Sequence, residues 1–443
     1  MTDAANAPEQ DQQQELDADV IVIGGGPAGA TVAGYLGRAG HRVILLERDI
    51  HPREHVGESL VPATNIVTHD LGFWEKMESA NWVKKPGATW TGTKGKIGSE
   101  FVVTFADYPQ KIPNPDYTYH VDRAIFDAMY LRHASELGAE VVQGASVLKV
   151  LFDGDRACGV RVKVLGREFD LGSQFVVDAS GRRTVLGKQL GLWSKDKQFN
   201  QFAVYSWFKD VQPPSPETAE YIHVHFLPVE RGWVWHIPIY EGITSVGVVV
   251  EKSDFQKSGK DHETFFNELM QMTPNTRHIL DGATRTRPFA IEADYSYKMD
   301  RFSGPGWMLV GDAARFVDPI FSSGVSVAMR SGQFAWQALE KSMNGGDEHA
   351  AFEEYNEIVD RGVQIWYEWI TLYYRLQALF TRFSSKPEYK ADIQQLLQGE
   401  VFDKDAVHVL NRMKEALKVI EGDETHIARQ FLNDSIEVVE ASA

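Results

Sequence analysis

Three glycines near the N-terminus have the spacing that lets a backbone approach a phosphate. Gly24, Gly26 and Gly29 follow the pattern G-x-G-x-x-G directly after the apolar run 20–23, and Glu47 closes the next apolar run. The first glycine permits a tight turn, the second lets N–H groups approach a pyrophosphate, and the third lets a helix pack closely on the strand. The carboxylate of Glu47, at the end of the second apolar run, could accept a hydrogen bond from a ribose hydroxyl. Together these residues predict a dinucleotide site rather than a plain glycine-rich loop.

Asp312 is a second candidate for contact with such a cofactor. It stands in Gly311-Asp312-Ala313-Ala314, between an apolar strand and an expected helix. A carboxylate at this position suits a hydroxyl-rich chain such as the ribityl chain of a flavin, although it could also simply cap the helix. Taken with the glycine turn and Asp122-Arg123, it favours a flavin.

A lysine pair and a serine turn could carry further chemistry. Lys84 and Lys85 precede Pro86-Gly87, and Phe321-Ser322-Ser323-Gly324 opens a predicted helix. Two adjacent lysines are ordinarily exposed, but burial can retune the pKa of one of them for use as an amine or an ammonium. Free N–H groups at the start of a helix attract an anion, although a serine there also serves as a cap.

Two tryptophans lie on a predicted strand. Trp233, Trp235 and Ile237 alternate, so they project from one face and form a bulky apolar wall; ordinary sheet core is the alternative. His223 and His225 also share a strand face, and His51 and His55 have H-x-x-x-H spacing in an expected loop. Neither pair has an evident third ligand, so we interpret both as structural and predict no metal site.

Composition excludes several classes of partner. Lys+Arg 45 against Asp+Glu 62 gives a net charge of −17, which argues against nonspecific binding to nucleic acid or to an anionic membrane surface. The one cysteine, Cys158, allows no intrachain disulfide and fits a reducing cytoplasm. Residues 1–17 are polar and predict a disordered tail, and no apolar run is long enough to span a membrane.

Nearly the whole chain resembles the flavin-dependent halogenases, within the wider family of FAD monooxygenases. The stretches that carry the resemblance are GGGPAG (24–29), HVGESLVP (55–62), KPGATW (85–90), HVDRAIFD (120–127), WVWHIP (233–238) and GDAARFVDPIFSSGV (311–325). The W-x-W-x-I-P pattern is a signature of that family. The resemblance implies an enzyme that uses reduced FAD to make hypohalous acid from O2 and a halide, chloride or bromide, and halogenates an electron-rich aromatic ring.

The resemblance also assigns roles to residues. Lys85 would be catalytic and deliver the oxidant, with Lys84 as the second choice, and the backbone of Ser323 and Gly324 would bind the halide. The wall between flavin and substrate would consist of Trp233, Trp235, Ile237 and Pro238. The residues expected to contact FAD are Gly24, Gly26, Pro27, Ala28, Gly29, Glu47, Arg48, Glu58, Ser59, Arg123, Asp312, Pro319, Gly324 and Val325.

The implied fold is α/β. It has a Rossmann-type FAD-binding domain of the FAD monooxygenase and halogenase fold, an antiparallel β-sheet layer on the substrate side and a C-terminal helical region. The expected boundaries are 1–17 for the tail, 18–200 for the first part of the FAD-binding domain, 201–283 for the sheet, 284–345 for the return of the FAD-binding domain, and 346–443 for the helices.

Within the family, the chain is most similar to halogenases that act on a pyrrolyl group tethered to a carrier protein, as in the pyoluteorin pathway. The matching stretches include FNQFAVYSWF, EADYSY, WYEWITLYYRL and LLQGEV. The implied partners are an acyl or peptidyl carrier protein and a separate flavin reductase, and homodimerisation is left open. The densest basic run, Arg182, Arg183, Lys188, Lys195 and Lys197, is a candidate docking patch or an ordinary solvated face.

Two other readings share part of this pattern. An aromatic hydroxylase on the same flavin scaffold would keep the glycine turn and Asp312 but would not need Lys85 or the tryptophan wall. A flavoprotein that binds FAD without turnover is the other alternative, and the intact Lys85, Trp233, Trp235 and Ser323 argue against it.

Overall fold

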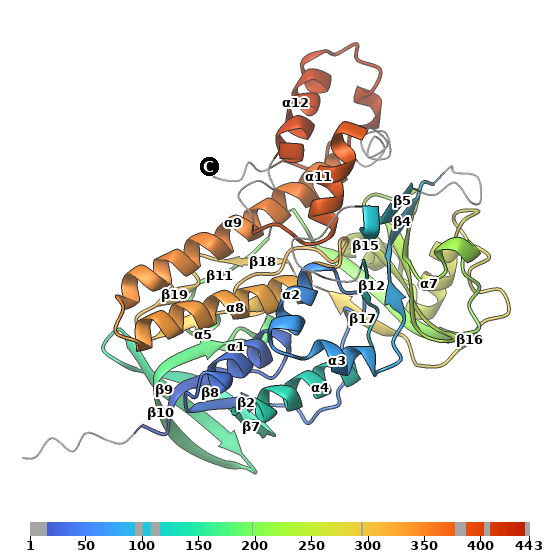
Figure 1. The fold of residues 1–443 in the computed structure, drawn as a ribbon. Helices are drawn as coiled ribbons and strands as arrows, with labels where there is room; N and C mark the ends of the chain where they lie inside the picture. The colour runs from blue at the N-terminus through green and yellow to red at the C-terminus, as the bar shows by residue number, and fades with distance from the viewer. Residues whose placement is uncertain are drawn as a thin grey trace, which may run out of the picture.

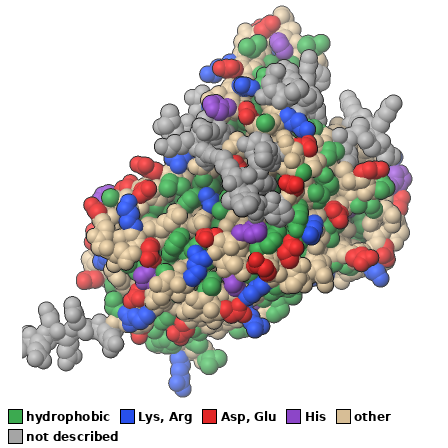
Figure 2. All heavy atoms as spheres, viewed as in Figure 1, with side chains coloured by type: hydrophobic (Ala, Val, Ile, Leu, Met, Phe, Trp, Pro, Cys, Tyr) green, Lys and Arg blue, Asp and Glu red, His purple; other side chains and the backbone are tan. Residues whose placement is uncertain are grey.

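The structure is a computed structural model, and it describes residues 16–93, 101–107, 116–196, 198–293, 296–376, 387–402 and 408–438. Within these ranges no helix has both the length and the apolar character needed to cross a membrane. On the face shown in Figure 2, acidic and basic side chains are interspersed rather than gathered by sign.

The glycine turn belongs to a parallel sheet. β1 (Ala18–Ile23) runs parallel to β2 (Val43–Glu47) on one side and to β10 (Arg167–Asp178) on the other. The sheet is extended by β7 (Glu140–Gln143) beyond β2 and by β20 (Trp307–Leu309) and β19 (Ser303–Gly304) beyond β10. β8 (Ala145–Asp153) and β9 (Arg156–Val164) pair antiparallel next to β10. β1 is almost wholly buried, as expected of a strand with both faces covered.

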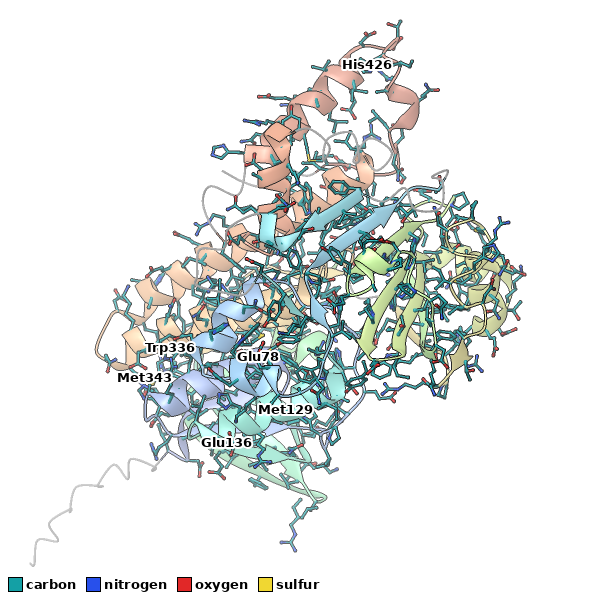
Figure 3. All side chains as sticks on the ribbon, turned by 45° about the vertical axis from the view of Figure 1, so that its right-hand side comes forward. Glu78, Met129, Glu136, Trp336, Met343 and His426 are labelled. Atoms are coloured by element: carbon teal, nitrogen blue, oxygen red, sulfur yellow. The ribbon has the colours of Figure 1, made fainter. Side chains whose placement is uncertain are left out.

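Three helices lie against one another beside this sheet (Figure 1). α1 (Pro27–Arg38) packs on both α4 (Arg123–Glu136) and α8 (Gly324–Met343). Pro27 occupies the first turn of α1, where its missing N–H costs nothing, and the Asp122 side chain accepts the Ala124 N–H to cap α4. Met129, Trp336 and Met343 contact the core of this layer from α4 and α8 (Figure 3).

A second, mainly antiparallel sheet stands beside the first layer. Its strands in spatial order are β16 (Thr284–Arg285), β12 (Gln201–Lys209), β15 (Ile243–Glu251), β14 (Trp233–Tyr240), β13 (Ile222–Phe226), β4 (Gly87–Thr91) and β5 (Phe101–Thr104), with β17 (Ala290–Ala293) also paired to β12. Phe265 and Phe266 of α7 (His262–Met270) pack on Val246 and Val248 of β15. The other face of the sheet packs toward the C-terminal helices.

The C-terminal part is helical, as expected. α9 (Glu348–Arg375) buries an aromatic stripe that includes Trp366, Trp369 and Tyr373 against the second sheet. α11 (Pro387–Leu397) and α12 (His408–Gly422) form the upper end of the molecule in Figure 1. The α/β class, the antiparallel layer and the helical C-terminus are thus as predicted, while the domain boundaries remain predictions.

One helix differs from the sequence-based expectation. The sequence predicts a helix-like segment over 63–76, but the chain forms two helices, α2 (Ala63–Asp70) and α3 (Trp74–Glu78). Gly72 lies between them at φ +71, a backbone conformation that cannot continue a right-handed helix.

Candidate active site

A cavity of about 690 Å³ lies where the parallel sheet meets the second sheet. One side is formed by the glycine turn after β1 and the end of β2, at the carboxyl edge where such sheets bind ligands. The other side is formed by Ala203, Ile222, Trp233 and Trp235 from the second sheet. The cavity is therefore bounded by both layers.

The glycine turn leaves no room for side chains. A Cβ at Gly24, which has φ +105, would lie 2.5 Å from the Ala179 carbonyl oxygen, and one at Gly29 would lie 1.9 Å from the Gly24 carbonyl oxygen. Such close approach presents the start of α1 to the cavity. A bare backbone at the positive end of a helix is the cradle that a pyrophosphate requires, so these residues fit the expected dinucleotide cofactor.

The predicted cofactor residues gather at this cavity. All of them line it except Gly29, which instead lets α1 approach β1. Glu47 accepts the Gly25 N–H at 2.6 Å and the Asp49 N–H at 2.7 Å, which fixes its carboxylate at the end of β2. Their roles as cofactor contacts remain predictions.

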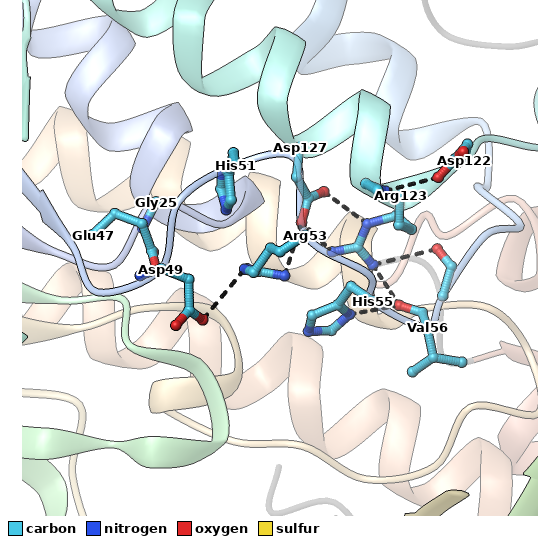
Figure 4. A network of polar contacts seen from close by, with 12 residues as sticks. Gly25, Glu47, Asp49, His51, Arg53, His55, Val56, Asp122, Arg123 and Asp127 are labelled. Carbon is cyan, nitrogen blue, oxygen red and sulfur yellow. Dashed lines mark hydrogen bonds and ion pairs between the residues drawn. The ribbon is translucent and has the colours of Figure 1, made fainter. Parts of the chain in front are cut away.

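An arginine network braces one end of the cavity (Figure 4). Arg123 donates to both carboxylate oxygens of Asp127, at 2.8 and 3.0 Å, and to the Val56 carbonyl at 2.8 Å. Burial alone would raise the pKa of Asp127, but the Arg123 charge and hydrogen bonds lower it below its ordinary value. Arg53 and His55 also line the cavity. Neither is among the residues expected to contact FAD, although His55 begins the stretch HVGESLVP that carries the family resemblance. The signal for Arg53 is its position just before that stretch.

Asp312 lies at the start of a short 3-10 helix, Gly311–Ala313, whose N-cap residue is Val310. The alternative that Asp312 serves only as a helix cap is therefore wrong. Asp312 lines the cavity, and burial raises the pKa of its carboxyl group to about 6. Glu58 lines the cavity as well; burial raises its pKa, and the Trp207 indole N–H donates to it at 3.3 Å.

The tryptophan wall faces the cavity. Trp233, Trp235 and Ile237 all line it, with the two indole rings 5.9 Å apart between centroids. Trp235 is fixed by its hydrogen bond to the Ser245 hydroxyl at 3.0 Å. Pro238 is not part of this lining, because alternate residues of a strand point to opposite faces. The wall thus consists of three of the four residues expected.

The histidines of β13 and β14 lie on the opposite face of this sheet. His223 and His225 are buried with parallel rings 6.1 Å apart, and His236 lies 5.2 Å from His223. Burial lowers the pKa of His225 to about 3, so its imidazole is neutral at ordinary pH. In the described part of the chain, no cluster of three or more His, Cys, Asp or Glu residues could hold a metal ion.

Lys85 is enclosed in protein. Its side chain is 2% exposed, its ammonium nitrogen donates to the Leu60 carbonyl at 2.6 Å, and it lies 5.6 Å from the centre of the Phe105 ring. Burial lowers the pKa of Lys85 to about 7, so a large fraction is neutral amine near neutral pH. Lys85 does not line the cavity, but its acceptor Leu60 follows Ser59, which does.

Lys84 has the opposite environment. Its side chain is half exposed, and it donates to the Tyr117 hydroxyl at 2.8 Å. The hydrogen bond to Tyr117 raises the pKa of Lys84 and keeps it charged. Of the two neighbouring lysines, only Lys85 therefore remains a candidate nucleophile.

The serine turn leads directly into α8. Ser322, at φ +57, and Gly324 line the large cavity, whereas Ser323 faces a smaller cavity on the other side of the turn. Ser323 is the N-cap residue of α8, but its side chain makes no capping hydrogen bond. The first N–H groups of this 20-residue helix are thus directed to the region between the two cavities.

The basic run divides between two environments. Arg182 and Arg183 line the large cavity, and Arg182 pairs with Glu292 at 2.5 Å while its side chain stays 39% exposed, so a docking role for this run stays a prediction. Lys188 is exposed, and Lys197 lies outside the described residues. Ala179, Ser180 and Gly181 line the same cavity, so the turn after Asp178 is part of it.

Comparisons with known proteins agree with this geometry. A family model described as the FAD binding domain matches residues 17–364. A pyrrole-2-carbonyl peptidyl-carrier-protein chlorinase of Pseudomonas fluorescens is 44% identical over 94% of this chain and 97% of its own length. A pyrrole-2-carbonyl peptidyl-carrier-protein brominase of Pseudoalteromonas luteoviolacea is 32% identical over 87% of this chain and 92% of its own length.

Solved structures show the same architecture. The flavin-dependent brominase Bmp2 superposes with a TM-score of 0.82 at 31% identity, covering 91% of this chain and 99% of that chain. The myxobacterial chondrochloren halogenase CndH superposes with a TM-score of 0.76 at 31% identity, covering 91% of this chain and 96% of that chain.

Proposed function

This chain belongs to the flavin-dependent halogenases, and we propose that it halogenates a pyrrolyl group carried on an acyl or peptidyl carrier protein. The observation that carries the substrate class is the 44% identity to a pyrrole-2-carbonyl carrier-protein chlorinase, which extends over 94% of this chain. That span includes most of the C-terminal helical region, where we expect the substrate entrance. The relatives are named as a chlorinase, a brominase and a tryptophan halogenase, and none of these three names describes a hydroxylase or a flavoprotein without turnover.

FAD is the cofactor of this family, and the large cavity suits it. We assign the pyrophosphate to the glycine turn, the adenosine ribose to Glu47 and the ribityl chain to Asp312. When reduced and bound, FAD supplies the two electrons with which O2 and a halide give hypohalous acid. We assign the halide to the backbone of Ser323 and Gly324 at the start of α8, where helix N–H groups favour an anion.

Lys85 is proposed as the residue that delivers the halogen. Its amine is buried and, within the described part of the chain, hydrogen-bonds to a carbonyl rather than to a carboxylate. This supports the role because a neutral amine can accept halogen from hypohalous acid. Trp233, Trp235 and Ile237 line the large cavity on the sheet face that packs toward the C-terminal helices. We assign them to the wall between flavin and substrate, so that the oxidant rather than the flavin would reach the substrate.

The proposed reaction needs two protein partners. A carrier protein brings the pyrrolyl group, and a separate flavin reductase supplies reduced FAD. We propose a cytoplasmic location, supported by the single cysteine and by the carrier-protein substrate. Homodimerisation stays open.

A competition experiment tests the tethered substrate. The enzyme receives FAD, a flavin reductase and chloride together with equal concentrations of pyrrolyl-carrier protein and free pyrrole-2-carboxylic acid. We expect halogen on the carrier-bound pyrrole and at least about tenfold less on the free acid, because remote binding energy from the carrier positions the ring. Mass spectrometry measures both products. Equal halogenation of the two compounds would contradict the tethered-substrate proposal.

A further inference from the structure

A second, small cavity lies on the other side of the serine turn. Its volume is about 20 Å³, enough for one small ion or water molecule. It is lined by residues of the segment 312–318, of the serine turn, of α8 and of α9, namely Asp312, Arg315, Phe316, Val317, Asp318, Ser323, Gly324, Val327, Val363 and Trp366. Asp312, Phe316 and Gly324 also line the large cavity, so the two spaces are neighbours.

Two buried donors at this cavity lack hydrogen-bond acceptors. Among the described residues, neither the Arg315 Nε–H nor the Trp366 Nε1–H has a hydrogen-bond partner, and the two residues are 8% and 2% exposed. Both groups can only donate, because neither carries a lone pair for hydrogen bonding. A buried donor without an acceptor is costly, so the two donors indicate an acceptor that enters the cavity.

The remaining surroundings favour an anion. Ser323 stands at the N-terminus of α8, where the aligned peptide dipoles give a partial positive charge. The Arg315 guanidinium adds a full charge and is held over the Tyr367 ring at 4.8 Å. Because the space fits one small particle, a monatomic anion matches it better than a carboxylate or phosphate.

Asp318 lines the cavity, so its charge decides whether an anion can bind there. Its carboxyl group is 1% exposed and accepts the Ile320 N–H at 2.9 Å and the Tyr374 hydroxyl at 3.3 Å. Burial raises the pKa of Asp318 to about 7, with Glu251 raising it and Arg231 lowering it. Asp312 is the second acid at the cavity and Arg315 its cation. An ionised Asp318 would repel an anion, whereas a protonated Asp318 would not.

We propose that this cavity binds one halide ion together with one proton, with Arg315 and Trp366 donating to the ion and Asp318 taking up the proton. The inference rests on the proposed halogenase function and extends the halide site beyond the backbone of Ser323 and Gly324. It also matches the balance of the reaction. Reduced FAD, O2, one halide ion and one proton give oxidised FAD, water and hypohalous acid, in which the halide has lost two electrons.

Halide binding to the oxidised, FAD-loaded protein tests the two donors. Chloride affinity is measured by ³⁵Cl NMR line broadening and by the flavin absorbance change, in wild type, Trp366→Phe and Arg315→Met. We expect each variant to bind chloride about tenfold more weakly, because each loses one donor to an ion. The control is Trp336→Phe (Figure 3), which removes an indole N–H about 18 Å along α8 from its start at Gly324. Trp336 lines neither cavity.

The pH dependence tests Asp318. Below the Asp318 pKa the acid is already neutral, so chloride affinity should be constant. Above it, binding requires proton uptake, so affinity should fall about tenfold per pH unit. Asp318→Asn should remove this fall.

These outcomes separate the inference from the proposed function. Unchanged chloride affinity in Trp366→Phe and Arg315→Met, with full FAD content, would overturn the assignment of the donors. The same pH slope in Asp318→Asn as in wild type would overturn the proton uptake. If wild type halogenates the carrier-bound pyrrole in either case, the proposed function stands without this cavity.

Discussion

Replacing Lys85 with alanine is expected to lower halogenated product at least about 100-fold while FAD binding is retained, since positioned catalytic groups contribute on that order. Lys85 lies outside the large cavity, so its loss removes no cofactor contact. The readouts are halogenated carrier protein by mass spectrometry, FAD content by absorbance, and the rate of reduced-flavin oxidation. The last two should stay close to wild type.

Two further variants make this test specific. Lys84→Ala, at the exposed neighbouring position, should halogenate normally. Lys85→Arg keeps the charge but cannot lose its proton, so it should be as inactive as Lys85→Ala if the neutral amine carries the halogen. Near wild-type product from Lys85→Ala would remove Lys85 from the mechanism.

Substituting Gly29 with alanine is expected to abolish FAD binding. The added Cβ would lie 1.9 Å from the Gly24 carbonyl oxygen, so α1 and the end of β1 must separate and the phosphate-binding turn is lost. We expect the purified variant to contain less than about a tenth of the wild-type FAD, because a backbone shift at the pyrophosphate removes several hydrogen bonds together.

The matched control for this change is Gly92→Ala. A Cβ at Gly92 meets no atom of the described residues within 4 Å, and Gly92 is not among their glycines with positive φ, so this variant should keep its FAD. Flavin absorbance and thermal unfolding of both variants distinguish a lost cofactor site from a lost fold. Full FAD content in Gly29→Ala would contradict the assignment of the turn.

The glycine turn and Glu47 were predictable from the sequence because their geometry is local, whereas most of the more distant expected FAD contacts came from the resemblance. The tight turn at Gly24, the close packing at Gly29 and the acid at Glu47 belong to one strand, helix and strand unit, whose spacing is visible in the chain. The choice of Lys85 over Lys84 came from the resemblance. The structure adds the physical difference between them, which is burial.

Residues brought together by tertiary packing could not be predicted in this way. Arg315 follows the Asp312 stretch and Trp366 lies on α9, and only the packing of α9 beside the serine turn places both at one cavity. Arg182 and Arg183 belong to a basic run in the sequence, and only the fold shows that the turn after β10 also places them at the large cavity. Pro238 belongs to the W-x-W-x-I-P pattern but not to the cavity wall.

The central claim is that this enzyme uses reduced FAD to place a halogen on a carrier-bound pyrrole. Its most direct test is intact-protein and fragment mass spectrometry of pyrrolyl-carrier protein after reaction with the enzyme, FAD, a flavin reductase, O2 and chloride. We predict replacement of a ring hydrogen by chlorine, with the two-isotope pattern of chlorine, and no modified product when chloride is omitted. An added oxygen atom that appears with or without chloride would contradict the account and indicate a hydroxylase.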